Sequence, residues 1–340
     1  MIRTKNIGKK LLTLAAILIL FNSCNNNNFR IDVSHITIEQ DFVRFDRMLT
    51  DIDTSMLIDS ALILANHYPD FWNLYTYRIL NLGGVGNRAF NDKFLNYYSD
   101  YFLEDTYGNV EVVFEDFSQL EEGILEAFKH YAHYFPGEVI PDIYTYVGAY
   151  NQSVVVADSF IGLALEKYQG SSCDFYYQLS IPSFGRFKMQ AEFLVTDCIR
   201  AWGQTEFLYS DSLDNLISRM IYEGKLMYFT KAMVPEKHDS VFIQYTGKQL
   251  DWCKQFEAKM WTHLVEEKIL FESKHDYIVR YIYDGPFTAS FDQKSPARTG
   301  VWLGWQIVNS YMAKHPDVTL RELMNDNNYH NILNLSRYNP

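Results

Sequence analysis

The stretches MQAEFLVTDCIRAWGQTE (residues 189–206) and DSLDNLISRMIYEGKLMYFTKA (residues 211–232) decide the fold of this chain. Both have the length and apolar spacing of helices, with a short polar turn between them. The second is apolar almost all the way round, which predicts a helix buried in the core. Glu223 nevertheless lies in its middle, on one stripe with Leu216 and Met220. Since an unpaired carboxylate in an apolar stripe is costly, Glu223 should be paired, protonated or bound to a metal.

The first 23 residues have the features of a secretory signal peptide. A basic start precedes the apolar run Leu11–Phe21, which is shorter than the ~20 residues that a membrane-spanning helix needs. Ser23 and Cys24 follow this run in an arrangement that resembles a bacterial lipobox. We therefore expect residues 1–23 to be removed, Cys24 to carry acyl chains that anchor it in a membrane, and residues 24–30 to form a polar tether. The alternative left open is ordinary secretion with an incidental cysteine.

The charge of the chain limits its partners. It holds 30 basic and 42 acidic residues, and loss of the four basic residues in the signal peptide changes the net charge from −12 to −16. Such an acidic protein is not expected to bind nucleic acid or to dock on anionic lipid by charge. The acyl groups on Cys24 are then the expected link to the membrane.

A single domain is expected over residues 31–340, because no internal repeat and no long linker interrupts it. The domain should be α+β and predominantly helical. A small β-hairpin is predicted from Ile143–Tyr150 and Ser153–Ala157, which are rich in tyrosine and valine. The pattern after it predicts a helix over Asp158–Tyr168, and residues 171–188 are expected to be a loop.

The remaining cysteines and the motif search indicate no standard chemistry. Cys173, Cys198 and Cys253 are odd in number and form no CxxC pair, which argues against a disulfide framework and favours free thiols. One bridge among them is left open. The chain contains no HExxH, GxSxG, Walker A or zinc-knuckle motif, so we expect no catalytic residue, no metal and no cofactor.

A set of short segments carries a family resemblance. In chain order they are Arg44-Phe-Asp46, Tyr68-Pro69, Tyr134-Phe-Pro136, Asp197-Cys-Ile-Arg-Ala201, Met220-Ile-Tyr-Glu-Gly-Lys-Leu-Met-Tyr-Phe229, Gln249-Leu-Asp-Trp-Cys253, Asp284-Gly-Pro-Phe287 and Gly300-Val-Trp-Leu-Gly-Trp-Gln-Ile-Val308. Together they resemble the gliding-motility lipoprotein family GldB of the Bacteroidota, over about residue 30 to Pro340. The resemblance implies an envelope lipoprotein that gliding members need for gliding, and relatives also occur in members that do not glide.

GldB-type proteins are similar in turn to predicted zinc peptidases, which implies a zincin-like (gluzincin-like) fold whose site is degenerate here. If the helices correspond, the HExxH positions are residues 196–200, and the third zinc ligand is Glu223. Thr196 is a poor substitute for an imidazole, and Asp197 would be a shortened base. Arg200 would place a cation where zinc needs a lone pair. The degenerate-site candidates are therefore Thr196, Asp197, Arg200 and Glu223, and we expect a salt bridge between Arg200 and Glu223.

The function expected from these features is that of a non-catalytic envelope lipoprotein. It would be a structural or accessory component related to the gliding-motility machinery, acting through contacts with other envelope proteins. One alternative is a metal-dependent, peptidase-like hydrolase with non-standard ligands. Another is a glycan- or peptide-binding lipoprotein that uses exposed aromatic residues. No acidic run follows Cys24, and since such a run resembles a surface-export signal in this phylum, we expect the outer membrane, facing the periplasm.

Overall fold

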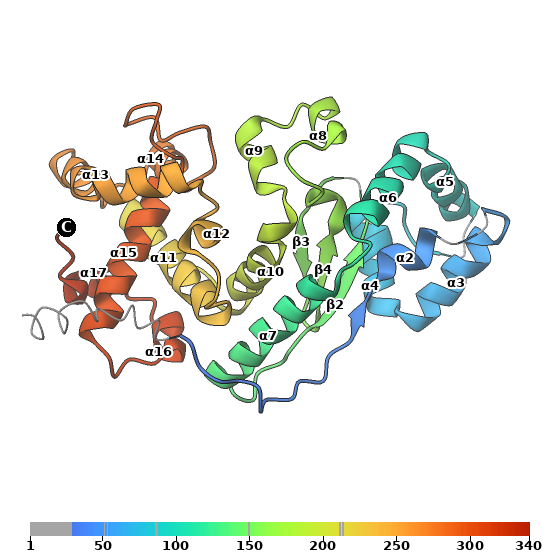
Figure 1. Ribbon diagram of the computed structural model, residues 1–340, viewed down its shortest axis with the longest axis horizontal. Coiled ribbons are helices and arrows are strands. Elements are labelled where there is room, and N and C mark those ends of the chain that lie inside the picture. Colours follow the sequence, from blue (N-terminus) through green and yellow to red (C-terminus); the bar gives the residue numbers. More distant parts are fainter. Residues whose placement is uncertain are drawn as a thin grey trace, which may run out of the picture. The chain divides into compact units, whose positions relative to one another are not determined.

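The computed structural model describes residues 29–340, apart from residues 51, 53, 86, 87, 149, 211 and 213. Cys24 and the predicted signal peptide lie outside the described residues. Asp32–Pro340 forms one compact unit. Within it, many helices surround a small mixed β-sheet, so the molecule is a mostly helical α+β protein (Figure 1). In the part of the chain that is described, no helix is both long and apolar enough to cross a membrane.

The sheet is built from four short strands of the described chain, in the order β1-β2-β4-β3. They are β1 (Phe42–Val43), β2 (Asp142–Tyr146), β3 (Val154–Val156) and β4 (Phe160–Ala164). β2 pairs in parallel with both β1 and β4, while β3 runs antiparallel to β4. Parallel strands are normally covered on both faces, and all five residues of β4 are indeed buried.

Two predictions for this region were wrong. The hairpin joins β3 to β4, whereas the sequence analysis paired residues 143–150 with residues 153–157. The predicted helix over 158–168 is instead β4 followed by a short 3-10 turn at Leu165–Lys167. A run of five buried apolar residues has neither the alternation of a half-exposed strand nor the length of a helix, so periodicity alone does not separate the two.

The helices before and around the sheet hold an aromatic core. They are α2 (Phe45–Thr50), α3 (Leu57–His67), α4 (Pro69–Asn73), the π-helical η2 (Leu74–Ile79), α5 (Arg88–Tyr98), α6 (Tyr101–Val113) and α7 (Ser118–Tyr134). Phe71 stacks on Tyr144 of β2, with ring centroids 4.4 Å apart, and Phe45 packs edge-on against Phe71. Edge-on and offset ring pairs of this kind explain why so many aromatic residues are needed here.

The second half of the molecule is all helical and centres on α11. Its helices are α8 (Asp174–Gln178), α9 (Ser183–Lys188), α10 (Ala191–Glu206), α11 (Leu216–Met233), α12 (Asp239–Ile243), α13 (Gly247–Glu266), α14 (His275–Ile282), α15 (Thr299–Lys314), α16 (Leu320–Asn325) and α17 (Tyr329–Ser336). In Figure 1, α11 and α13–α17 gather on the side of the sheet opposite α2–α6. The predicted loop over 171–188 therefore contains two short helices, α8 and α9.

α10 and α11 are the two helices that the opening stretches predicted, with later starts. α11 begins where the Asn215 side chain accepts a hydrogen bond from the Ser218 amide, a standard N-cap. Fourteen of its eighteen residues are buried, as its all-round apolar pattern indicates. It packs along α15, where Gly224 and Gly304 bring the two backbones into contact. This pairing fixes the position of α11 against α15.

Candidate functional site

A polar cavity of about 590 Å³ lies against α10 and α11. Its charged lining residues are Asp197, Arg200, Glu223, Asp284 and Arg298. α10 also contributes Ala201 and Gln204, so the lining positions on this helix follow the spacing of one helical face. α11 contributes Glu223, and the loops after α12 and α14 close the cavity with Gln244 and Asp284. The charges of three distant segments therefore meet at one point of the fold.

Arg200 and Glu223 form the predicted salt bridge. Arg200 Nη2 donates to Glu223 Oε2, and this contact joins α10 to α11. Of the two side chains, 18% and 15% remain exposed, so the pair lies at the rim of the cavity. Glu223 thus interrupts the buried apolar stripe of α11 between Met220 and Met227, and its partly exposed carboxylate meets the guanidinium.

Asp197 has neutral partners. Its Oδ1 accepts from Gln244 Nε2 at 2.7 Å, and its Oδ2 accepts from the Tyr168 hydroxyl at 3.1 Å. Burial raises the pKa of Asp197 to about 6, against the opposing effects of the Tyr168 hydrogen bond and the charge of Arg200. A carboxylate held on both oxygens is fixed in orientation.

The structure does not bring Thr196 to this point. Thr196 is 2% exposed, and its hydroxyl donates to the Phe193 carbonyl at 2.9 Å within α10. It is absent from the described lining of the polar cavity, while Asp197 and Arg200 are part of it. The expectation that Thr196 faces Glu223 was therefore wrong. The reason is that the cavity face of α10 runs through residues 197, 200, 201 and 204, beside residue 196.

Arg298 and Asp284 are site residues that the sequence analysis did not identify as such. Arg298 immediately precedes α15 and has a left-handed backbone with φ of 60°. Its Nε lies 3.8 Å from Asp284 Oδ1, and its Nη1 donates a long hydrogen bond of 3.4 Å to the Ile243 carbonyl. Asp284 was quoted only as part of a family segment. Nothing in the local pattern around residue 298 signals that its guanidinium is buried.

The donor set of the polar cavity suits ion pairing better than metal binding. No group of three or more His, Cys, Asp or Glu side chains in the described chain is placed to hold a metal ion. Glu223 already contacts a guanidinium, and Asp197 contacts two neutral donors. A metal at Glu223 would lie against the positive charge of Arg200, which is an unfavourable neighbour for a cation.

The three cysteines that the structure describes are free thiols, as the sequence analysis favoured. Cys198 and Cys253 are buried, and burial raises the pKa of both thiols well above the usual value. Thiolates are the reactive form of cysteine, so these two side chains are packing residues.

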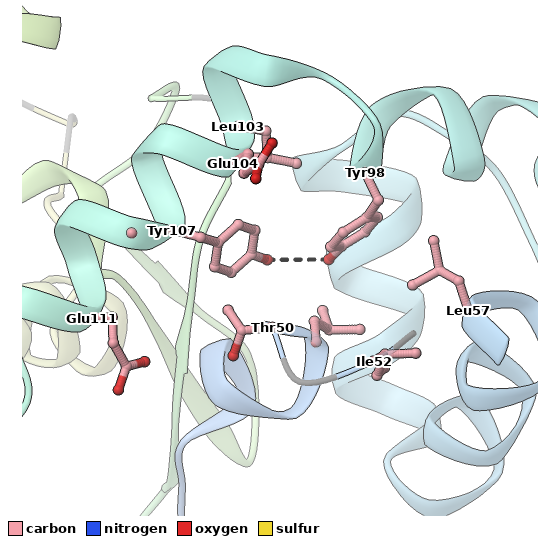
Figure 2. Close-up of a pocket in the computed structure, with 10 residues that line it drawn as sticks. Thr50, Ile52, Leu57, Tyr98, Leu103, Glu104, Tyr107 and Glu111 are labelled. Carbon is pink, nitrogen blue, oxygen red and sulfur yellow. Dashed lines mark hydrogen bonds between the residues drawn. The ribbon is translucent and has the colours of Figure 1, made fainter. Parts of the chain in front are cut away.

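A second cavity, of about 420 Å³, lies between α2, α3 and α6 (Figure 2). Its walls are largely apolar, with Ile52, Leu57 and Leu103 among the lining residues. The Tyr98 and Tyr107 hydroxyls meet in it at 3.1 Å, as the dashed line in Figure 2 shows. Burial raises the pKa of both phenols well above the usual value, so they act as neutral hydrogen-bonding groups. This cavity has the walls of an apolar pocket and holds no reactive pair.

Comparison with known proteins gives one match. The family model described as gliding motility protein GldB matches residues 26–340. The matched range includes α10, α11 and every residue of the polar cavity. No curated protein and no solved structure matches the chain.

Proposed function

The chain belongs to the gliding motility protein GldB family, and we propose from this premise that it is a non-catalytic accessory lipoprotein of the cell envelope. Family membership gives the relation to gliding motility and to lipoproteins. The non-catalytic role goes beyond family membership, and the observation that supports it is the Arg200–Glu223 salt bridge. Glu223, which would be the remaining metal ligand of a degenerate zincin-like site, has the Arg200 guanidinium as its partner.

The segments that carry the family resemblance meet at the polar cavity, and this supports the proposal. Residues 197–201, 220–229 and 284–287 carried the resemblance in the sequence, and each supplies a charged lining residue to the polar cavity. These charges pair with one another or with neutral donors. We infer that the cavity stabilises the contact between α10, α11 and the following loops, and that the protein works through its surface.

We further propose that the polar cavity is a degenerate zincin-like site. It rests on α10 and α11 alone, where Arg200 meets Glu223. The position of Thr196, buried within α10, counts against the register 196–200 for the lost HExxH motif. A register that starts at Asp197 and ends at Ala201 would place both end positions on the cavity face.

The place of action that we propose is the outer membrane, facing the periplasm, with acyl groups on Cys24 as the anchor. The family match begins two residues after Cys24, so the matched domain would follow the anchor directly. Partners would be other envelope proteins. The acidic surface is consistent with this choice, since it disfavours nucleic acid and anionic lipid.

The aromatic-surface alternative has weak support. The exposed large aromatic side chains lie on separate elements and include Tyr77, Tyr101, Tyr177, Phe271 and Tyr283. A glycan-binding row needs several such rings along one groove, and among these residues Tyr283 alone lines the polar cavity.

Complementation tests the proposed role. In a gliding host that lacks its own family member, the full chain should restore colony spreading, and the Cys24→Ala variant should not. The Arg200→Gln/Glu223→Gln double variant, which removes both charges together, should restore spreading as well as the wild type does. Loss of spreading in this double variant at normal protein level would show that the charged pair has a chemical role.

A further inference from the structure

A third cavity, of about 300 Å³, lies beside the polar cavity, and we call it the α9 cavity. The two cavities share Gln244, Asp284 and Arg298 as a common wall. On its own side the α9 cavity has an ammonium group, Lys188, and a largely apolar wall. The apolar part is formed by Phe184, Phe187, Tyr245 and Pro286.

Two cations share one carboxylate at this wall. Lys188 Nζ donates to Asp284 Oδ1, and Arg298 Nε lies 3.8 Å from the same oxygen. Although burial opposes it, the charges of Arg298 and Lys188 hold the pKa of Asp284 below its usual value, so this carboxylate is ionised. Arg200 adds no net charge to this wall, because it is paired with Glu223. In the lining of the α9 cavity itself, the two cations Lys188 and Arg298 therefore face one carboxylate, Asp284. Asp197, in the adjoining polar cavity, also attracts both cations.

Arg298 is the less satisfied of the two cations. Its side chain is 6% exposed, and its buried Nη2 has no hydrogen-bond partner among the residues that the structure describes. Burial and the charge of Arg200 lower the pKa of Arg298. Burial and the charge of Arg298 likewise lower the pKa of Lys188 to about 8. Both shifts show that burial chiefly disfavours the cationic forms, and an added anion would stabilise those forms.

The α9 cavity can be reached from solvent. The Asp284 side chain is 51% exposed and that of Lys188 is 19% exposed. Phe184 and Phe187 are each partly exposed beside them on α9. A solute can therefore approach the charge cluster and the apolar wall together.

We propose that the α9 cavity binds the carboxylate of an apolar organic acid, either free or at the C-terminus of a peptide. Lys188 and Arg298 supply the positive charge, and Phe184 and Phe187 receive the apolar group. A monoanion fits better than phosphate, because Asp284 lies within the same cluster and repels a second negative charge. A mostly apolar pocket with a few placed polar groups is the usual form of a small-molecule site. This inference does not depend on the role in gliding.

Binding is tested by titration calorimetry on the full-length chain in detergent. N-acetylphenylalanine should bind, whereas its amide, acetate and inorganic phosphate should each bind at least about tenfold more weakly, a loss of ~1.4 kcal/mol. The peptide Gly-Gly-Phe with a free or an amidated C-terminus distinguishes the peptide source from the free acid. Preference for the free carboxylate in either form supports the proposal.

The variants locate the site. Lys188→Gln and Arg298→Gln should each weaken binding of the favoured carboxylate by about tenfold or more. Lys231→Gln is the matched control, because Lys231 forms a similar half-buried pair with Asp239 at 2.7 Å and lies outside the lining of the α9 cavity. If Arg298→Gln does not fold, Lys188, which is less buried than Arg298, keeps the test valid. Equal binding of acid and amide, binding of phosphate alone, no binding at all, or binding unchanged in Lys188→Gln would overturn the proposal.

Discussion

At the scale of single residues, the Arg200–Glu223 salt bridge is intermediate between a surface pair and a buried pair. Exposed pairs contribute ~0–1 kcal/mol, and loss of one member of a buried pair costs ~3–5 kcal/mol because the other charge is stranded. With 18% and 15% of the side chains exposed, water can solvate a stranded charge in part. The pair should therefore matter for stability without dominating it.

Removing one member of this pair should destabilise the fold. We expect Arg200→Gln to lower the free energy of unfolding by about 1–3 kcal/mol, because Glu223 then lacks its partner. Glu223→Gln should have a similar cost, and the Arg200→Gln/Glu223→Gln double variant should cost less than the sum of the two. Urea denaturation of all four proteins gives the coupling energy. Additive costs would mean that the two side chains do not interact.

Glu166 gives a pH-dependent prediction. It is fully buried in the 3-10 turn that follows β4, where its Oε1 accepts from the amides of Gly148 and Tyr150, and burial raises its pKa to about 7. Between the ordinary carboxyl pKa and 7, the folded state holds a proton that the unfolded chain has lost. The contribution of Glu166 to stability therefore falls as pH rises through this window.

The Glu166→Gln variant isolates that contribution. Its free energy of unfolding, relative to wild type, should rise between about pH 4.5 and pH 7 by up to ~3 kcal/mol, since each pKa unit is ~1.36 kcal/mol. Urea denaturation at a series of pH values measures the difference, and Glu122→Gln, on an exposed position of α7, is the control. A difference that stays flat across this range would contradict the buried, protonated state of Glu166.

At the scale of elements, α11 and α15 pack with their backbones in direct contact. A methyl group added at Gly304 would lie 1.7 Å from the Met220 carbonyl oxygen, and one added at Gly224 would lie 2.3 Å from the backbone of Gly304. Backbone atoms have little freedom to move inside paired helices. Glycine is therefore required at both positions, and α11 is held in place by α15 as well as by α10.

Gly304→Ala should separate these helices and destabilise the protein by about 3 kcal/mol or more, at the upper end of overpacking effects. Gly108→Ala on α6 is the matched control, because nothing lies within 4 Å of its added methyl group. In that control the better helix propensity of alanine should stabilise the fold by ~0.5–1 kcal/mol. Thermal unfolding of both variants decides the question, and a harmless Gly304→Ala would disprove the close packing.

The same elements show what the sequence could predict. α10 and α11 were predicted because they are long and have the apolar pattern of helices. The Arg200–Glu223 pair was predicted from the similarity to zinc peptidases, which aligned Arg200 with a metal ligand. β4 was missed because five buried apolar residues have no diagnostic period. The Lys188–Asp284–Arg298 cluster was missed because its members come from α9 and from the two ends of the loop between α14 and α15. Arg298 also adopts a left-handed backbone that only the tertiary contacts explain.

At the scale of the whole molecule, the proposed acyl anchor on Cys24 would attach the protein to the membrane, and the acidic domain would make the contacts with partner proteins. Cys24→Ala should move the protein from the membrane fraction to the soluble fraction of the envelope, because the proposed acyl anchor would be lost. Several acyl chains together would add tens of buried CH₂ groups, each worth ~0.8 kcal/mol, so the shift should be complete. Cell fractionation followed by immunoblotting measures it. A variant that stays in the membrane fraction would indicate another attachment.

The central claim is that Arg200 occupies the place of a metal at Glu223. The zinc content of the full-length protein tests this claim most directly. The protein is purified without chelators, supplied with zinc, freed of unbound metal and analysed by plasma mass spectrometry beside the Glu223→Gln variant. We expect that neither protein retains stoichiometric zinc. One zinc per chain in the wild type, lost in Glu223→Gln, would contradict it and would identify Glu223 as a metal ligand.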